Sequence, residues 1–211
     1  MRFPYLILIV ILSTLFSVQA FDVPDVLPRP DNKAINTKKP IKVFILSGQS
    51  NMVGFGNVPK SLTPLVREKK MFQNLVDEKG RWVSRKDVQY IYNLSNPKKA
   101  RDLSIKSNRK DYIGPELQFG HYMGYIHDEL VLVIKACNGN RCLAYDVLPP
   151  SQRKGKFSDP TWRIGCEYDK WFRQYCKQTL KNIGEIYPGY QGQGYQIAGF
   201  GWWQGHKDIN N

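Results

Sequence analysis

Three short blocks of the sequence carry polar groups that could hold a ligand and act on it. Ser50 lies in the block 47–52, where Gly48 lets the chain turn sharply and the serine hydroxyl would project. Gly114 can present a backbone N–H in a turn, and Gln204 brings a side-chain amide directly after an apolar run. A serine at such a turn is also well suited to capping the helix that follows, so both roles of this hydroxyl stay open.

The apolar runs around these blocks have the pattern of strands. Residues 41–46 and 130–134 are short, almost continuous apolar runs rich in branched side chains, which is typical of strands covered on both faces. Residues 197–203 form a third such run, whose glycines indicate close approach by a neighbouring element. A further strand is expected at 88–92, inside the irregular stretch 57–112.

Helical patterns separate these strands. Apolar side chains recur at three- and four-residue steps over 168–187, and Pro188–Gly189 ends the segment. A shorter helix is expected to begin at 114–116 and to run to about residue 126. Alternation of strands and helices predicts an α/β fold, a flavodoxin-like doubly wound parallel sheet in three layers with a long insertion near its front. Ligands of such sheets bind beyond the carboxyl ends of the strands, where the polar blocks are expected.

The first twenty residues have the pattern of a secretory signal peptide. Arg2 precedes an apolar run over 5–16, and a small-residue cleavage pattern ends at Ala20. The run is shorter than the roughly 20 residues that span a bilayer, and no later segment approaches that length. We therefore expect a signal peptide at 1–20, a leader at 21–40 and one domain at 41–211, in a secreted or periplasmic protein without stable membrane insertion after cleavage.

Composition and charge exclude several classes of protein. At 211 residues with 42% hydrophobic side chains the chain suits one globular domain and no fibrous or disordered class. The formal charge of +13 becomes +12 once Arg2 is removed, which favours anionic neighbours. The densest basic run, over 98–110, lacks helical or alternating periodicity and predicts a solvated loop. No recognition helix or aromatic stacking strand accompanies it, so we expect no nucleic-acid partner.

The cysteines favour disulfides over a metal site. The 4 cysteines, at positions 137, 142, 166 and 176, form none of the close C-x-x-C pairs that zinc normally needs. Export makes disulfides plausible, and three connectivities are open. Short loops favour Cys137 with Cys142 and Cys166 with Cys176.

Four sequence blocks together resemble a known family. They are residues 43–52 (Val-Phe-Ile-Leu-Ser-Gly-Gln-Ser-Asn-Met), 114–120 (Gly-Pro-Glu-Leu-Gln-Phe-Gly), 132–136 (Leu-Val-Ile-Lys-Ala) and 198–205 (Ala-Gly-Phe-Gly-Trp-Trp-Gln-Gly). In this order they are similar to the SGNH-hydrolase superfamily, and within it to sialate O-acetylesterases and acetylxylan esterase-like carbohydrate esterases. The resemblance covers the chain from Ile41 to its end. The Gly-Gln-Ser-Asn-Met block is the most distinctive.

The resemblance implies a role for each block. Ser50 matches the nucleophile, and its own N–H matches one donor of the oxyanion hole. Gly114 matches a second donor, and Gln204 matches the position where this branch supplies an amide. The implied reaction is transfer of an acetyl group from an acetylated carbohydrate to Ser50, followed by hydrolysis of the acetyl-enzyme, with no metal and no cofactor.

The sequence departs from the family in two places. The family's Asp-x-x-His block, which supplies the base and its carboxylate, does not follow Gln204, and the sheet is expected to lack its last strand and helix. Only His121, His127 and His206 could substitute, and His206, with Asp208 after it, is the candidate base. The second departure is the loop 136–142, where relatives tend to carry a tryptophan and a glycine pair, which puts the substrate contacts in doubt.

Several explanations of the missing block stay open. The chain could be a fragment, a binding protein that lacks the base, or one part of an assembly with a separately encoded C-terminal segment. The rival function is a non-catalytic basic extracellular carbohydrate-binding protein on the same fold. Its sugar-binding side chains would be exposed tryptophans, drawn from Trp162, Trp171, Trp202 and Trp203; Trp171 is better explained as a core residue, because it lies on the apolar face of the predicted helix.

Overall fold

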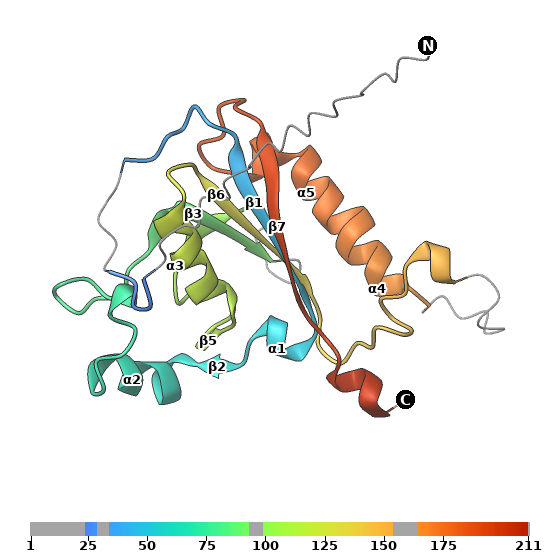
Figure 1. Cartoon of the computed structure of the whole chain (residues 1–211), viewed down its shortest axis with the longest axis horizontal. Helices are drawn as coiled ribbons and strands as arrows, with labels where there is room; N and C mark the ends of the chain where they lie inside the picture. Colours follow the sequence, from blue (N-terminus) through green and yellow to red (C-terminus); the bar gives the residue numbers. More distant parts are fainter. Residues whose placement is uncertain (1–23, 29–33, 93–98, 154–163, 211) are drawn as a thin grey trace, which may run out of the picture.

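A computed structural model describes residues 24–28, 34–92, 99–153 and 164–210 of the chain. Within these residues a five-stranded sheet has the strand order β4-β3-β6-β1-β7, and a small ribbon pairs β2 with β5 (Figure 1). The strands are β1 (Ile41–Gly48), β2 (Gly56–Asn57), β3 (Arg85–Tyr92), β4 (Arg101–Leu103), β5 (Tyr112–Ile113), β6 (Val131–Cys137) and β7 (Tyr195–Trp203). The helical segments are α1 (Ser50–Val53), η1 (Val58–Leu62), α2 (Thr63–Arg67), η2 (Gln73–Leu75), α3 (Glu116–Ile126), η3 (Pro150–Gln152), α4 (Cys166–Tyr168), η4 (Asp169–Cys176), α5 (Lys177–Lys181), α6 (Ile183–Ile186) and η5 (His206–Asn210).

The α/β class and the doubly wound topology expected from the sequence are confirmed. β1 lies between β6 and β7 and runs parallel to both. After β1 the chain forms α1, α2 and the sheet strands β3 and β4, and α3 then leads into β6, whereas α4, η4, α5 and α6 lead from β6 to β7. Figure 1 shows α3 on one side of the sheet and α4 and α5 on the other. The two crossovers therefore cover opposite faces, which makes the carboxyl end of β1 the point where the winding reverses.

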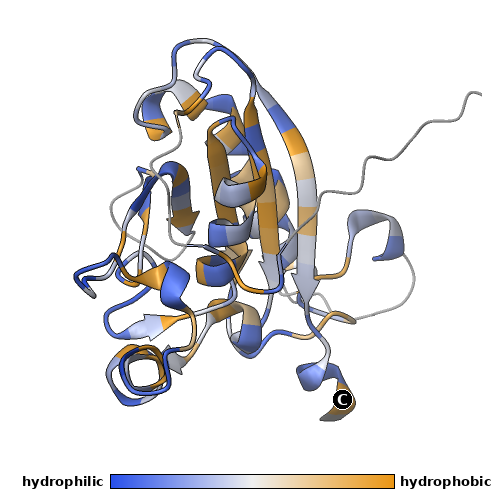
Figure 2. Ribbon diagram, turned by 60° about the vertical axis from the view of Figure 1, so that its left-hand side comes forward, coloured by the Kyte–Doolittle hydropathy of each residue, from blue (hydrophilic) through white to orange (hydrophobic). Residues whose placement is uncertain are grey.

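Each face of the sheet has its own apolar core. Along β6, Val131 and Val133 belong to the core on the side of α3, whereas Leu132 and Ile134 belong to the core on the side of the second crossover. Trp171 of η4 is fully buried in the second core. Figure 2 shows the apolar colour concentrated along the inner strands. Burial on both faces explains why β1 and β6 read as continuous apolar runs rather than alternating ones.

The predicted helices form, and the second crossover includes a π-helical stretch. α3 ends at Ile126, as its pattern predicts, and the helical segment expected over 168–187 is built from α4, η4, α5 and α6. η4 is the π-helical stretch, and Asn182 separates α5 from α6. No helix among the described residues is long and apolar enough to cross a membrane.

The last strand differs from its prediction. The run 197–203 is predicted to be covered on both faces, but most side chains of β7 are exposed. Among the described strands β7 pairs with β1 alone. Ile197 is 55% exposed and Phe200 56% exposed. The glycines do permit close approach, because a Cβ at Gly199 would lie 2.8 Å from the Phe44 ring and a Cβ at Gly201 would lie 2.7 Å from Leu46. Apolar composition identified the strand but not the number of its neighbours.

The expected disulfides are wrong for this structure, which joins none of the four cysteines in a disulfide. Cys166 and Cys176 lie at opposite ends of one continuous helical stretch formed by α4 and η4. At about 1.5 Å per residue such a stretch separates its ends by roughly 15 Å, whereas a disulfide needs Cα atoms within about 7 Å. Cys137 ends β6 in the core on the side of α3, and the amide of Cys142 donates to Asp146 Oδ2 over 3.0 Å.

His121 is a core residue of α3. Its side chain is 1% exposed, and neither ring nitrogen has a hydrogen-bond partner among the described residues. Burial, together with the positive charge of Arg85, lowers the pKa of His121 from 6.5 to about 3. The ring is therefore neutral in the folded protein at physiological pH, which fits a packing role and not proton transfer.

The burial of His121 predicts a loss of stability in acid. Below pH 6.5 the unfolded chain takes up a proton at this ring that the folded chain does not bind until about pH 3. The free energy of unfolding should therefore fall as the pH drops through this window, by at most about 1.4 kcal/mol per pH unit. Urea denaturation of His121→Phe between pH 7 and 4 should show a shallower slope than the wild type, whereas Tyr125→Phe, exposed on the same helix, should keep it. Equal slopes in all three proteins would contradict this account.

The exposed edge of β7 predicts self-association. An unpaired strand edge with exposed apolar side chains is a template for pairing with another chain. We expect Ile197→Lys to lower the apparent mass in concentration-dependent light scattering while the melting temperature changes little, because Ile197 is largely exposed. Val43, its fully buried register partner on β1, gives the matched control. Val43→Ala should lower the melting temperature and leave the association behaviour as it is. A wild type that is monomeric at all concentrations would refute the prediction.

Candidate active site

Ser50 lies where β1, α1 and the end of β7 meet. Gly48 has a φ of +148°, and a Cβ on it would lie 2.1 Å from the carbonyl oxygen of Trp203, so only glycine fits this position. The amide of Gln49 donates to the same oxygen over 3.1 Å. Ser50 is the first residue of α1, and the N-cap position belongs to Gln49. The capping role considered for Ser50 is therefore not realised, and its half-buried hydroxyl has no hydrogen-bond partner among the described residues.

Three side chains from elsewhere in the chain hold the end of α1. The carbonyl oxygen of Val53 accepts hydrogen bonds from Lys135 Nζ at 2.7 Å and from Asn108 Nδ2 at 2.9 Å. The carbonyl oxygen of Gly54 accepts one from Arg109 Nη2 at 2.9 Å. A single helical turn is unstable on its own, and two cations at its carboxyl end are favourably placed for the helix dipole. These contacts fix the turn that carries Ser50.

A buried ion pair links this turn to Gly114. Lys135 Nζ lies 2.5 Å from Glu116 Oε2, with side-chain exposures of 0% and 2%. Glu116 Oε1 accepts the backbone N–H of Gly114 at 2.8 Å. In the sequence, Lys135 and Glu116 stand out only as members of two of the family-like blocks, and their spacing does not indicate a pair. A lysine inside a fully buried strand is the signal that could have revealed the pair, because such a charge needs a buried partner.

Gly114 lies against the Ser50 turn, as predicted, but its N–H is already engaged by Glu116. A Cβ on Gly114 would lie 2.5 Å from Glu116 Oε2 and 2.9 Å from Lys135 Nζ, so no larger residue fits here. Gly54, with a φ of +88°, has the same restriction, because a Cβ on it would lie 2.3 Å from Gly114 Cα. The structure thus brings Gly114 against the backbone of Gly54, which directly follows the Ser50 helix.

Gln204 joins the end of β7 to the loop after β6. Its Nε2 donates to the carbonyl oxygen of Arg141 at 2.6 Å and lies 3.3 Å from Asp208 Oδ2. Its Oε1 is buried without a hydrogen-bond partner among the described residues. Asp208 also accepts the backbone N–H groups of Leu143 and Ala144, at 2.7 and 3.0 Å from Oδ1. Partial burial opposes the ionisation of Asp208, but these N–H donors outweigh it and lower its pKa.

None of the histidines contacts Ser50 in the described part of the chain. His121 is a buried residue of α3, as described above. His206 is exposed on η5, and Asp208, its expected partner, is engaged by the loop after β6. η5 does lie at the same end of the sheet as α1 (Figure 1). The structure therefore brings the Ser50, Gly114 and Gln204 blocks to one edge and shows no histidine in contact with the serine there.

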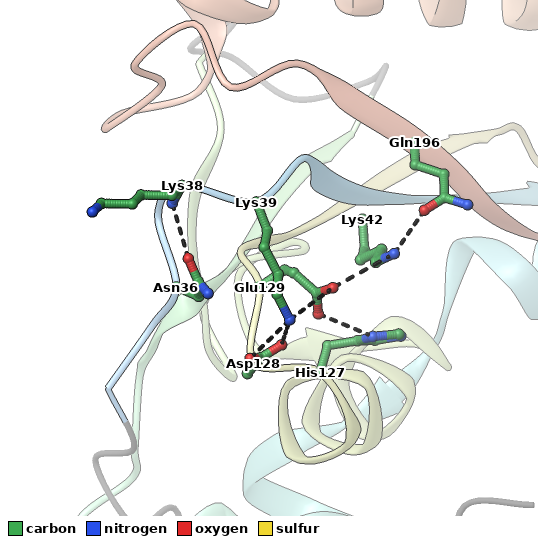
Figure 3. Close-up of polar contacts among 8 residues, drawn as sticks. All are labelled: Asn36, Lys38, Lys39, Lys42, His127, Asp128, Glu129 and Gln196. Carbon is green, nitrogen blue, oxygen red and sulfur yellow. Dashed lines mark hydrogen bonds and ion pairs between the residues drawn. The ribbon is translucent and has the colours of Figure 1, made fainter. Parts of the chain in front are cut away.

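His127 lies at the other edge of the sheet, in a cluster of charges. Its Nδ1 is 3.6 Å from Glu129 Oε2, and the other oxygen of that carboxylate, Oε1, is 3.6 Å from Lys42 Nζ (Figure 3). Lys39 bonds Asp128 at 3.1 Å beside them. Burial lowers the pKa of His127 more than the nearby carboxylate raises it. This cluster joins the starts of β1 and β6 and lies far along the sheet from Ser50.

No group of three or more histidine, cysteine or acidic side chains able to hold a metal ion occurs among the residues that the structure describes. The charged side chains nearest to Ser50 are instead paired with one another or with backbone carbonyls. The arrangement at this edge consists of a free hydroxyl on a fixed turn, with amide donors close by.

Comparison with known proteins identifies the family. The model of a family described as carbohydrate esterase, sialic acid-specific acetylesterase, matches residues 40–211. The chain belongs to this family. A search of curated proteins finds no match. Among solved structures, the chain is similar to a protein of Arabidopsis thaliana determined by X-ray diffraction at 1.6 Å, with 16% identity and a TM-score of 0.46. That match covers 81% of this chain and 59% of the other, so this chain spans less than two thirds of that protein's length.

The Lys135–Glu116 pair predicts a large and asymmetric effect of substitution. Lys135→Met leaves Glu116 as an unpaired buried charge, and we expect a loss of about 3–5 kcal/mol in the free energy of unfolding. The double variant Lys135→Met/Glu116→Leu should recover much of that loss, because no buried charge is left. Urea denaturation measures both. Arg81→Met, which breaks an exposed ion pair with Asp77, is the control and should shift the midpoint little. A double variant as unstable as the single one would contradict this reasoning.

Proposed function

We propose that this carbohydrate esterase removes acetyl groups from sugars through an acetyl-enzyme on Ser50. The observation that carries the proposal is the unpartnered Ser50 hydroxyl on a fixed turn, at the edge where the winding of the sheet reverses. Family membership supports the reaction class, and the contacts around α1 support the choice of residue. The acetylated sugar is the substrate, and the reaction uses no cofactor.

In the proposed reaction, Ser50 Oγ attacks the acetyl carbonyl carbon and its proton passes to a base. The tetrahedral intermediate collapses as the ester C–O bond breaks, and the departing sugar oxygen takes the proton from the base and becomes a hydroxyl. Water then attacks the acetyl-enzyme and releases acetate, and its proton returns to the serine through the base. The backbone N–H of Ser50 makes no hydrogen bond among the described residues, so it can donate to the oxyanion without losing a partner. Such a donor can be worth about 100- to 1,000-fold in rate.

Gly114 and Gln204 are the further oxyanion donors that we propose. Both are engaged as the structure stands, Gly114 by Glu116 and Gln204 by the Arg141 carbonyl. Gln204 can take up the role by rotating its amide, since its Oε1 has no partner to lose among the described residues. Gly114 can donate only if Glu116 shares or releases its N–H.

The base is the remaining requirement, since a serine hydroxyl needs an imidazole within hydrogen-bond reach. His206 is the candidate within the chain, because it lies two residues beyond Gln204 and its side chain is exposed. It would have to move toward Ser50, because no described contact joins them. A histidine from a separately encoded segment bound beside β7 is the other source that we propose. We also propose that the protein acts outside the cytoplasm after cleavage of residues 1–20.

One observation favours a second function, that of a non-catalytic carbohydrate-binding protein. Trp202 and Trp203 are 38% and 50% exposed at the end of β7, where sugars could stack on them. Trp171 cannot take part, because it is fully buried, and Trp162 lies outside the described residues. Binding through the net positive charge would fall with moderate salt, whereas ester hydrolysis would be absent.

Hydrolysis of p-nitrophenyl acetate and of acetylated xylan separates the two functions. Ser50→Ala should lower kcat/KM by about 1,000-fold or more, because the serine is the nucleophile. Ser61→Ala, an exposed serine of η1, is the matched control and should keep the wild-type rate. His206→Ala should lower the rate comparably if His206 is the base, and should leave it unchanged if the base comes from a partner. Equal rates for the wild type and Ser50→Ala would exclude a serine esterase and favour the binding protein.

A further inference from the structure

Two exposed aromatic side chains flank the turn that carries Ser50. Phe55 is 57% exposed and Tyr112 is 37% exposed. Tyr112 belongs to β5, and Phe55 directly precedes β2, in the ribbon where Gly56 pairs with Ile113. The two rings lie edge to face with centroids 6.4 Å apart. The two residues come from distant parts of the chain and form one aromatic surface, which we call the aromatic platform.

The contacts on both sides of the platform place it beside Ser50. Phe55 directly follows Gly54, whose N–H donates to the Ser50 carbonyl oxygen at 3.0 Å. Tyr112 stands two residues before Gly114, whose Cα packs against Gly54. α1 is a single turn, Ser50–Val53, that ends at its C-cap Gly54, so Phe55 lies one residue beyond the turn that carries the proposed nucleophile. The aromatic platform therefore adjoins the candidate site through Gly54 on one side and through Gly114 on the other.

Arg109 fixes the platform in place. Its guanidinium carbon lies 4.6 Å from the centre of the Phe55 ring and 5.3 Å from that of Tyr112. Its Nη2 donates to the carbonyl oxygen of Gly54, within the same turn. A cation over an aromatic face within about 6 Å is attracted to it. The same side chain therefore holds both rings and the turn that carries Ser50.

Scattered exposed apolar residues are normal on a protein surface and need no function. This pair differs because one side chain, Arg109, contacts both rings and also hydrogen-bonds the turn that carries Ser50. Rigid aromatic rings that are held in place and left exposed suit a ligand with a flat apolar face. The C–H groups on one face of a pyranose ring provide such a face, and an esterase acting on sugars must hold that ring while the acetyl group reaches the serine.

We propose that Phe55 and Tyr112 form a sugar-binding subsite, on which the pyranose ring of the acetylated substrate stacks during attack by Ser50. Arg109 acts as a positioning residue for both rings. This inference rests on the proposed esterase function for its substrate class. The platform binds the carbohydrate part of the substrate and takes no part in bond breaking.

The first test compares a sugar ester with an ester that has no sugar. Phe55→Ala and Tyr112→Ala should lose about tenfold more kcat/KM on acetylated xylotetraose or on 9-O-acetyl-N-acetylneuraminic acid than on p-nitrophenyl acetate, mainly through KM. Phe55→Trp should restore the sugar activity, and Phe55→Leu should not, because it is apolar without a ring. Tyr125→Ala is the control, since Tyr125 is an exposed tyrosine near the far end of α3. It should keep wild-type values on every substrate.

The second test measures binding without catalysis, so that the subsite and the esterase function can fail separately. Calorimetric titration of the same two sugars into Ser50→Ala and Ser50→Ala/Phe55→Ala should show weaker binding to the double variant. If hydrolysis proves independent of Ser50 but the double variant still binds sugar more weakly, the esterase proposal fails and the subsite stands. Equal affinities in the two proteins, or no binding of either sugar at millimolar concentration, would overturn the subsite even with the esterase intact.

Discussion

The buried contact between Lys135 and Glu116 is the interaction on which the site depends. Removing a charge from water is costly unless a partner and further hydrogen bonds replace the solvent, and here every partner is part of the site. The ammonium group bonds the last carbonyl of the Ser50 helix, and the carboxylate bonds the Gly114 amide. One ion pair therefore joins β6, α3 and α1. Separating the two charges would leave each one buried without a partner. The geometry of the turn therefore depends on a contact that also stabilises the core.

The topology of the sheet explains why these groups meet at this edge. β6 and β7 flank β1 on opposite sides, and their crossovers cover opposite faces. Neither crossover covers the carboxyl end of β1, so the turn into α1 is open to a ligand. The close approach of Gly48 to Trp203 and of Gly54 to Gly114 then draws the neighbouring segments inward. The glycines matter because any side chain would push these backbones apart.

Local pattern predicts the strands and helices well but not what surrounds them. β1, β6 and α3 follow from apolar runs and from a helix-start signal, because those residues make the contacts that their pattern implies. β7 has the same composition yet lies at an edge, since an apolar run does not record how many neighbours a strand has. The Ser50, Gly114 and Gln204 blocks could be placed at one edge from topology alone. The engagement of Gly114 by Glu116 could not, because it depends on tertiary contacts that spacing does not encode.

The two sides of the site differ in their freedom to move. Gly114 is enclosed by Glu116, Lys135 and Gly54, and any displacement would disturb the buried ion pair. Gln204 is held by a carbonyl and a carboxylate on partly exposed segments, and its own oxygen has no partner among the described residues. A rotation of this amide costs hydrogen bonds that a bound oxyanion would replace. The Ser50 side of the site is therefore preorganised. The end of β7 and η5, the segment that carries His206, are the parts that can move when a substrate binds.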